Sequence, residues 1–331
     1  MSLRRSNAGG PGDAWPRSAR RSVRRRTGPG RKTTRMTEDW ILTKAGTRPD
    51  VPFMVRQSTL NSASECSLRA WFDINGRVKP STGRAAAVGT GVHAGIEHYY
   101  LTGDIEHMAD VAVEAYRHET MFIAADQYPD GRAAGIEEDT VDITRTIAAW
   151  QKMRDQVDWT LRPGRVVGVE VEWFASLDID PHWGAKGTVD LVHWNPDTAT
   201  LSLVDHKTTR RAWTKRKASP IVSTQAGFYA KYAAPLIAEE LGIRTPVNVT
   251  WTYDIYVLLK NSVNFVRHGP YLITEEIMRL TDRRVEAFIE SFDPNVEPVP
   301  NPSSALCSPK YCPAWDFCPY GGAADELVVT L

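Results

Sequence analysis

The run Leu203-Val204-Asp205-His206-Lys207-Thr208-Thr209 decides how the rest of this chain is interpreted. Its apolar start predicts a buried strand, which then carries an acid, one spacer and a lysine. Because side chains two residues apart on a strand point the same way, Asp205 and Lys207 should share one side of the sheet. Such a carboxylate can hold a hard divalent cation, and the lysine can position water or stabilise charge on a phosphate. Taken alone, the run is better explained as a surface strand with an ion pair, because short motifs often arise by chance.

Two neighbouring runs with a period of two predict an antiparallel meander. Residues 166–175 and 184–194 read as strands ahead of the strand at 200–207, with a turn sequence at Asn195-Pro196-Asp197-Thr198. If the turn is centred between Asp197 and Thr198, residues whose numbers add up to 395 face each other. Asp190 then lies opposite Asp205 with Cβ atoms roughly 5 Å apart, and the two carboxylates repel unless a cation lies between them. A slip of one residue would separate the acids onto opposite faces.

Helical periodicity surrounds this meander. The residues from Ala85 to Leu101 predict a helix that carries His93, and Gly89 and Gly91 indicate either close backbone packing or a start nearer Thr90. A short helix beginning at Ser58 or Asn61 should carry Cys66. Further helices are predicted at 107–125, 136–157, 223–236 and 274–292, and further strands at 247–259 and 263–273. The helix at 223–236 places Gln225 and Tyr229 four residues apart on one face, and Thr274 is the expected N-cap of the last helix.

Composition and charge set the broad class. The chain has 331 residues, of which 42% are hydrophobic and 24% charged, which is ordinary for a globular protein. No run of about 18 apolar residues predicts a membrane span. The zero net charge hides a division, because residues 1–35 hold eleven basic residues and one acid. This Arg-rich segment should be disordered. It is either a nucleic-acid-binding arm or upstream sequence read from an early start, and we favour the second, with Met36 as the natural beginning.

A basic stretch directly follows the strand that carries Asp205. We interpret it either as a solvated loop or as a loop that contacts phosphates and stacks on bases beside the site. The residues that would do so are Arg210, Arg211, Trp213, Lys215, Arg216 and Lys217.

The four cysteines form one pattern: Cys307, Cys312 and Cys318 follow a C-x4-C-x5-C spacing, and Cys66 lies far upstream. No secretory signal precedes them, so a reducing cytoplasm is expected and disulfides are disfavoured. Four thiolates predict an iron–sulfur cluster or a structural zinc that ties the two ends of the fold together. We favour [4Fe–4S], because zinc sites more often use closely paired cysteines. Four unrelated buried thiols are the alternative.

These features together resemble a known family. The elements that carry the resemblance are His93, Gly187-Thr188-Val189-Asp190, Asp205-His206-Lys207 and Gln225-x-x-x-Tyr229. In order and spacing they resemble the motifs of the PD-(D/E)XK nuclease superfamily, and most closely its RecB-type and CRISPR-associated exonuclease branch. The resemblance covers about residues 55–320. One cysteine before the core and three after it also resemble that branch's four-cysteine iron–sulfur clamp, although C-x2-C-x5-C is its more usual spacing.

The resemblance implies a role for each of these residues. His93, Asp190 and Asp205 would bind Mg²⁺ or Mn²⁺, with the carbonyl of His206 as a further ligand. Lys207 would orient or activate the attacking water. Gln225 and Tyr229 would hold the DNA end or the lysine, and Glu170 would be an additional acid. Such a site hydrolyses phosphodiester bonds with a metal ion that generates the nucleophile and polarises the phosphate.

The resulting prediction is an α/β nuclease with a restriction-endonuclease-like core, a mixed sheet flanked by helices and an iron–sulfur clamp. The expected boundaries are a tail at 1–36, a nuclease domain at 50–322 with a helical insertion at about 104–160 and a cysteine region at 303–320, and a tail at 323–331. The expected activity is a metal-dependent exonuclease on single-stranded or end-bearing DNA in recombination, repair or replication processing. A prokaryotic cytoplasm, or that of a virus-infected prokaryote, is the expected location. No G-x-x-x-x-G-K-[ST] motif is present, so a helicase or recombination protein would supply unwinding. The alternative is a catalytically silent DNA-binding or adaptor module with a structural metal site.

Overall fold

The computed structural model describes most of the chain from residue 41 onward. The described ranges are 41–76, 83–123, 125–156, 164–244, 247–304, 306–308, 311–315 and 318–321. The Arg-rich segment 1–36 and the tail 323–331 lie outside these ranges, so the two expectations for them stay predictions. Within the described residues, no helix is long and apolar enough to cross a membrane.

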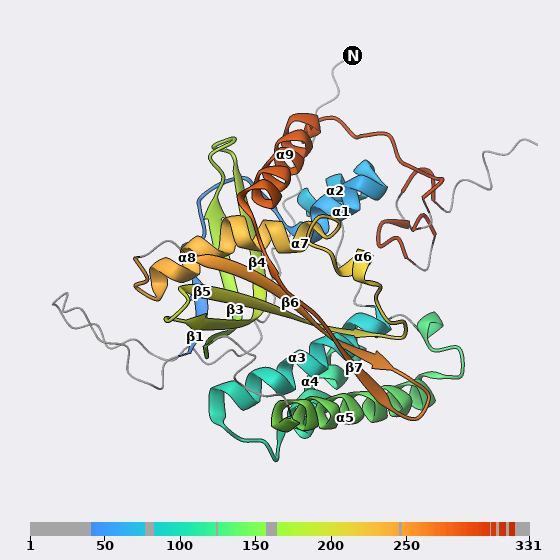
Figure 1. Ribbon diagram of the computed structural model, residues 1–331. Helices are drawn as coiled ribbons and strands as arrows, with labels where there is room; N and C mark the ends of the chain where they lie inside the picture. The colour runs from blue at the N-terminus through green and yellow to red at the C-terminus, as the bar shows by residue number, and fades with distance from the viewer. Residues whose placement is uncertain are drawn as a thin grey trace, which may run out of the picture. The chain divides into compact units, whose positions relative to one another are not determined.

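A mixed sheet of seven strands forms the centre of the fold (Figure 1). Six strands lie in the order β1-β3-β4-β5-β6-β7, and β2 pairs with β4. Their bounds are β1 Leu42–Ala45, β2 Phe53–Val55, β3 Arg165–Ser176, β4 Trp183–Asn195, β5 Thr200–Thr209, β6 Asn248–Leu258 and β7 Val263–Leu272. The long strands begin and end within two residues of the predicted limits. The short strands β1 and β2 were not predicted.

The meander has the predicted register. β3, β4 and β5 are antiparallel neighbours, and all five paired positions of β4 and β5 add up to 395, from Asn195 opposite Thr200 to Leu191 opposite Val204. The side chain of Asn195 accepts hydrogen bonds from the next turn amides, at 2.9 Å from Asp197 N. β5 then pairs in parallel with β6, so the sheet is mixed as predicted.

Three helices lie together on one side of the sheet in Figure 1: α3 (Arg84–Thr102), α4 (Met108–Thr120) and α5 (Arg132–Gln156). They share one apolar cluster with buried side chains of β6. Helices α4 and α5 fall within residues 104–160, and the prediction that this range is an insertion stays a prediction. The glycines of α3 reflect close packing: a Cβ on Gly91 would lie 2.6 Å from the carbonyl of Ala112, and one on Gly95 would lie 2.8 Å from that of Met108. The helix starts at Arg84, so the alternative start nearer Thr90 was wrong.

The remaining helices lie elsewhere in the fold. They are α1 (Gln57–Glu65), α2 (Ser67–Ile74), α6 (Lys215–Ala218), α7 (Thr224–Phe228), α8 (Ala234–Glu240) and α9 (Glu275–Ser291), with a short 3-10 turn η1 (Ala125–Gln127). The predicted single helix near Cys66 is two helices, which meet at this extended residue. One π-helical turn, η3 (Tyr229–Ala233), joins α7 to α8. Thr274 caps α9 as predicted, because its hydroxyl accepts from Ile277 N.

Candidate active site

The strands β4 and β5 separate where the two predicted acids lie. Their last paired position is Leu191 opposite Val204, and one residue further Asp190 Oδ2 accepts a hydrogen bond from His206 N at 2.7 Å. Beyond this point β4 stays paired with β3, and β5 stays paired with β6. Polar side chains can therefore reach the gap between the two strands without competing with a ladder of backbone hydrogen bonds.

Asp205 lies in this gap with two side-chain partners. Lys207 Nζ is 2.6 Å from Asp205 Oδ2, which confirms that the acid and the lysine share one side of the strand. Gln225 Nε2 donates to Asp205 Oδ1 at 2.6 Å, so α7 also holds this carboxylate. Burial raises the pKa of Asp205 to about 6 although Lys207 opposes the shift, and the charge of Asp190 adds to the rise. Burial lowers the pKa of Lys207, but Asp205 and Asp190 outweigh it and keep the ammonium charged.

His93 of α3 meets two acids on the other side of this gap. Its Nδ1 donates to Glu170 Oε1 at 3.0 Å, its Nε2 donates to the His206 carbonyl at 3.1 Å, and Nε2 lies 3.7 Å from Asp190 Oδ2. Burial lowers the pKa of His93, but the charges of Asp190 and Glu170 outweigh burial and raise the pKa to about 10. Burial likewise raises the pKa of Asp190. Glu170 has a φ of +43°, a left-handed conformation that is uncommon for a residue with a side chain.

Three of these residues fit a divalent metal ion. Among the described residues, His93, Glu170 and Asp190 are the one set of three or more potential ligands whose donor atoms lie close together, within 4.8 Å. Two carboxylates, one imidazole and the nearby His206 carbonyl suit a hard or borderline cation such as Mg²⁺ or Mn²⁺. Both ring nitrogens of His93 act as donors here, so His93 must lose a proton to become a ligand. Asp205, predicted as a ligand, is outside this trio and is bound by Lys207 and Gln225.

Tyr229 packs against the same strand end. A Cβ on Gly187 would lie 2.9 Å from the Tyr229 hydroxyl, so only glycine permits this approach. Burial raises the pKa of Tyr229, and the charges of Asp205 and Asp190 raise it further. The structure thus brings together His93, Asp190, Asp205, Lys207, Gln225 and Tyr229, as well as the backbone of His206, while the His206 ring lies buried beside Tyr256.

The residues of the predicted DNA-contacting loop fall into two groups: some have partners within the protein, and others are exposed. Arg210 forms ion pairs with Asp142 at 2.9 Å and Glu138 at 3.3 Å, so it fastens the loop to α5. Trp213 packs against Tyr253 with ring centroids 5.2 Å apart and ring planes tilted by 58°, and Lys217 Nζ lies over the Trp213 ring, 4.3 Å from its centroid. Arg211, Lys215 and Arg216 are exposed. Arg210 therefore has a structural partner, which the sequence prediction did not include.

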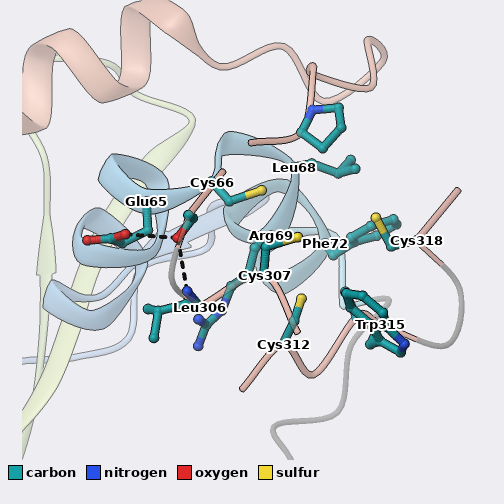
Figure 2. Close-up of a pocket in the computed structure, with 13 residues that line it drawn as sticks. Glu65, Cys66, Leu68, Arg69, Phe72, Leu306, Cys307, Cys312, Trp315 and Cys318 are labelled. Carbon is teal, nitrogen blue, oxygen red and sulfur yellow. Dashed lines mark hydrogen bonds between the residues drawn. The ribbon is translucent and has the colours of Figure 1, made fainter. Parts of the chain in front are cut away.

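The four cysteines line one pocket (Figure 2). Leu68, Phe72, Ala314 and Trp315 supply apolar walls. All four thiols are half-buried and free, and burial raises the pKa of Cys307 and of Cys312. In the described part of the chain, however, their sulfurs do not form a set close enough to share one ion. A four-thiolate clamp is not formed in this arrangement, and the iron–sulfur cluster remains a prediction.

Glu170, expected as an additional acid, lies beside His93 and Asp190. It lies between Val169, opposite Leu191, and Val171, opposite Val189, and so faces Asp190 across the β3–β4 hairpin. An acid placed opposite a motif acid in the neighbouring strand is the sequence signal that points to it.

The family model described as PD-(D/E)XK nuclease superfamily matches residues 56–319. No curated protein matches the sequence. Among solved structures, the chain is similar to a "Putative exonuclease" from Eubacterium rectale, at 12% sequence identity and a TM-score of 0.46. That match covers 85% of this chain and 90% of the other.

Proposed function

Since the chain belongs to the PD-(D/E)XK nuclease superfamily, we propose that it is a Mg²⁺- or Mn²⁺-dependent deoxyribonuclease that hydrolyses phosphodiester bonds. The observation that carries the proposal is the pairing of two neighbouring groups: the trio His93, Glu170 and Asp190, and the Asp205–Lys207 pair held by Gln225. A structural ion pair alone would not require three further ionisable side chains beside it.

Each residue has a task that follows from its contacts. His93, Glu170 and Asp190 would hold the divalent ion, which supplies an activated water and polarises the phosphate. Lys207 keeps its positive charge beside Asp205, so it can stabilise the negative charge that develops on the phosphate oxygens. Gln225 fixes the orientation of Asp205, which leaves the carboxylate turned toward the gap between β4 and β5. Tyr229 bounds the site beside Gly187 and can contact the bound strand.

We further propose that the enzyme is an exonuclease of the RecB-type and CRISPR-associated branch, acting on single-stranded or end-bearing DNA. The order and spacing of the motifs and the exposed basic loop beside the site support this narrower assignment. Recombination, repair or replication processing is the corresponding role, with a helicase or recombination protein as partner.

The cysteine pocket is proposed to hold a [4Fe–4S] cluster, with structural zinc as the alternative. Four free thiols around one apolar pocket supply the ligands that either group requires. A single zinc ion with bonds of about 2.3 Å needs its four sulfurs close together, whereas a four-iron cluster spaces them more widely. The preference for the cluster rests on the C-x4-C-x5-C pattern of the sequence, because zinc sites more often use closely paired cysteines. Iron and acid-labile sulfide analysis of protein purified without oxygen distinguishes the two, and a colourless protein with one bound zinc would contradict the cluster.

The activity is tested on end-labelled single-stranded DNA with Mn²⁺, Mg²⁺ or EDTA, using protein purified without oxygen. We expect metal-dependent shortening that Asp205→Asn abolishes and the matched turn variant Asp197→Asn retains. Labels at the 5′ or 3′ end report polarity, and a circular strand separates exonuclease from endonuclease. If the folded, metal-supplied protein cleaves no form of DNA, the chain is a silent DNA-binding module instead.

A further inference from the structure

A second polar pocket adjoins the candidate active site along the first half of β4. Its walls include Arg56, Gln57, Ser58, Lys186, Thr188 and Tyr229. Lys186, Thr188 and Asp190 are alternate residues of one strand, so Lys186 lies about 13 Å along β4 from Asp190. Tyr229 lines this pocket, and its hydroxyl lies beside Gly187, three residues before Asp190 on β4. The pocket therefore lies next to the acidic trio along the same strand.

Two cations in this pocket have no carboxylate bound to them. Neither Arg56 nor Lys186 forms an ion pair with any residue that the structure describes. Partial burial lowers the pKa of Lys186, the positive charges of Arg56 and Arg48 lower it further, and the negative charges of Asp73 and Glu172 oppose this shift. These cations repel one another across a concave surface, so an anion placed between them would relieve the repulsion.

The start of α1 adds backbone donors to the same pocket. Arg56 is extended, with φ −116° and ψ 160°, and α1 begins at Gln57 without a side-chain cap. The amides of Thr59 and Leu60 both bond to the Arg56 carbonyl, at 3.1 and 3.2 Å. The amides of Gln57 and Ser58 have no acceptor within the helix, because the first turn of a helix leaves its amides free. Such amides bind phosphate oxygens well when cations lie beside them.

We propose that Arg56, Lys186 and the first turn of α1 form a phosphate subsite for the DNA strand whose scissile phosphate lies at the acidic trio. This inference rests on the proposed function and names how the strand is held. With a rise of about 3.4 Å per nucleotide in a helical strand, 13 Å corresponds to about four nucleotides, and to fewer in an extended strand. The subsite therefore holds a phosphate a few nucleotides from the cut.

One acid lowers the positive charge of this subsite. Glu172 also lines the pocket, is exposed, and lies opposite Thr188 in the β3–β4 ladder. Its carboxylate repels a phosphate, so replacing Glu172 by Gln should tighten strand binding. This expected gain separates a phosphate subsite from a merely structural group of cations, because a structural role would not make binding stronger.

The test measures equilibrium binding of fluorescein-labelled single-stranded DNA to the full chain in EDTA, by anisotropy at several salt concentrations. We expect Lys186→Gln and Arg56→Gln each to weaken binding about tenfold and to reduce the slope of log K against log salt by about 0.7. Lys186→Arg should restore both values, and Glu172→Gln should tighten binding. Arg117→Gln removes an exposed cation on α4 and is the matched control. It should leave the DNA affinity and the salt slope nearly unchanged.

The oligonucleotide ends identify which phosphate is bound. Strands with a 5′-phosphate, a 3′-phosphate or hydroxyl ends are compared. A loss confined to one phosphorylated end assigns the subsite to that terminal phosphate, and an equal loss on all strands assigns it to an internal phosphodiester. Unchanged affinity and slope for folded Lys186→Gln and Arg56→Gln would overturn the subsite even if the wild type cleaves DNA. Binding with the predicted slopes but without cleavage would support the subsite and refute the nuclease, and a wild type that neither binds nor cleaves would refute both.

Discussion

The acidic centre and the cysteine pocket differ in how far the protein itself has arranged them. At the acidic centre every charged side chain already has a partner at hydrogen-bond or ion-pair distance, and the residues lie on strands and helices. At the cysteine pocket the thiols come from the junction of α1 and α2 and from a segment after α9 with little regular structure, and they share a pocket without forming one ligand set. A site built on regular elements is rigid before its ligand arrives, whereas a site built on loops depends on the ligand to fix it.

The largest expected effect lies at the acidic centre. Asp205→Asn and Lys207→Gln should each lower kcat about 10²- to 10⁴-fold, because they remove charge at the point where the phosphate reacts. Circular dichroism and melting should show an intact fold in both variants. If folded cysteine variants reduce kcat by as much, catalysis depends on the cysteine pocket as well, and the two regions are not independent.

The next effect concerns stability and the cysteine pocket. If the cysteine pocket holds the proposed metal group, Cys66→Ser should lower Tm by about 5–10 °C, since losing that group would remove several kcal/mol and each kcal/mol shifts Tm by about 2–4 °C at this chain length. Ser308→Ala, in the same segment, is the control and should leave Tm nearly unchanged. Bound iron should fall in parallel with Tm in the cysteine variant. An unchanged Tm in Cys66→Ser would mean that the pocket holds no stabilising metal group and contributes only apolar packing.

Metal binding at the acidic centre should depend on pH. The pKa of His93 is raised to about 10 from an ordinary value of 6.5, so its contribution to stability is full below about pH 6.5 and declines as pH rises toward 10. Mn²⁺ competes with that proton, so the rise in Tm on adding Mn²⁺ should be larger at pH 8.5 than at pH 6.5. At a hundredfold excess over Kd the stabilisation is about 2.7 kcal/mol. Glu170→Gln should remove most of this rise, and Cys66→Ser should keep it.

The smallest effect distinguishes anchored from free cations in the basic loop. Arg210→Gln should cost about 1 kcal/mol or less in stability and leave DNA affinity nearly unchanged, because Arg210 is bound to Asp142 and Glu138. Arg216→Gln should do the reverse, weakening DNA binding without changing Tm. Equal losses of affinity in both variants would mean that Arg210 leaves α5 when DNA binds.

Sequence reasoning predicted those features that follow from periodicity and turn chemistry. The register of β4 and β5 came from one turn, because antiparallel partners are fixed once the turn is centred. The His93 helix and the Thr274 cap were predicted from local patterns in the same way. β1 and β2 were not, since three or four residues carry too little periodicity and their parallel partners lie far along the chain.

The arrangement of side chains was less predictable than the arrangement of strands. Nothing local indicates that Glu170 adopts a positive φ, or that Arg210 turns toward Asp142 rather than toward solvent. Asp205 as a metal ligand stays a prediction, because the described set of close donor atoms contains His93, Glu170 and Asp190. These details depend on how α3 and α5 pack on the sheet, which is a property of the whole fold.

The π-helical turn between α7 and α8 has a consequence for how this helix tolerates insertions and deletions. A π turn contains one residue more than an α-helix needs, and one residue corresponds to about 100° of rotation. Gln225 before the turn contacts Asp205, while Ile237 after it is fully buried. A single-residue deletion within 229–233 would turn one of these side chains away from its partner. A related protein that lacks this residue should therefore carry compensating substitutions either before the π turn or after it, but not on both sides. A related protein that keeps both the Gln225 contact and the buried Ile237 should also keep the extra residue.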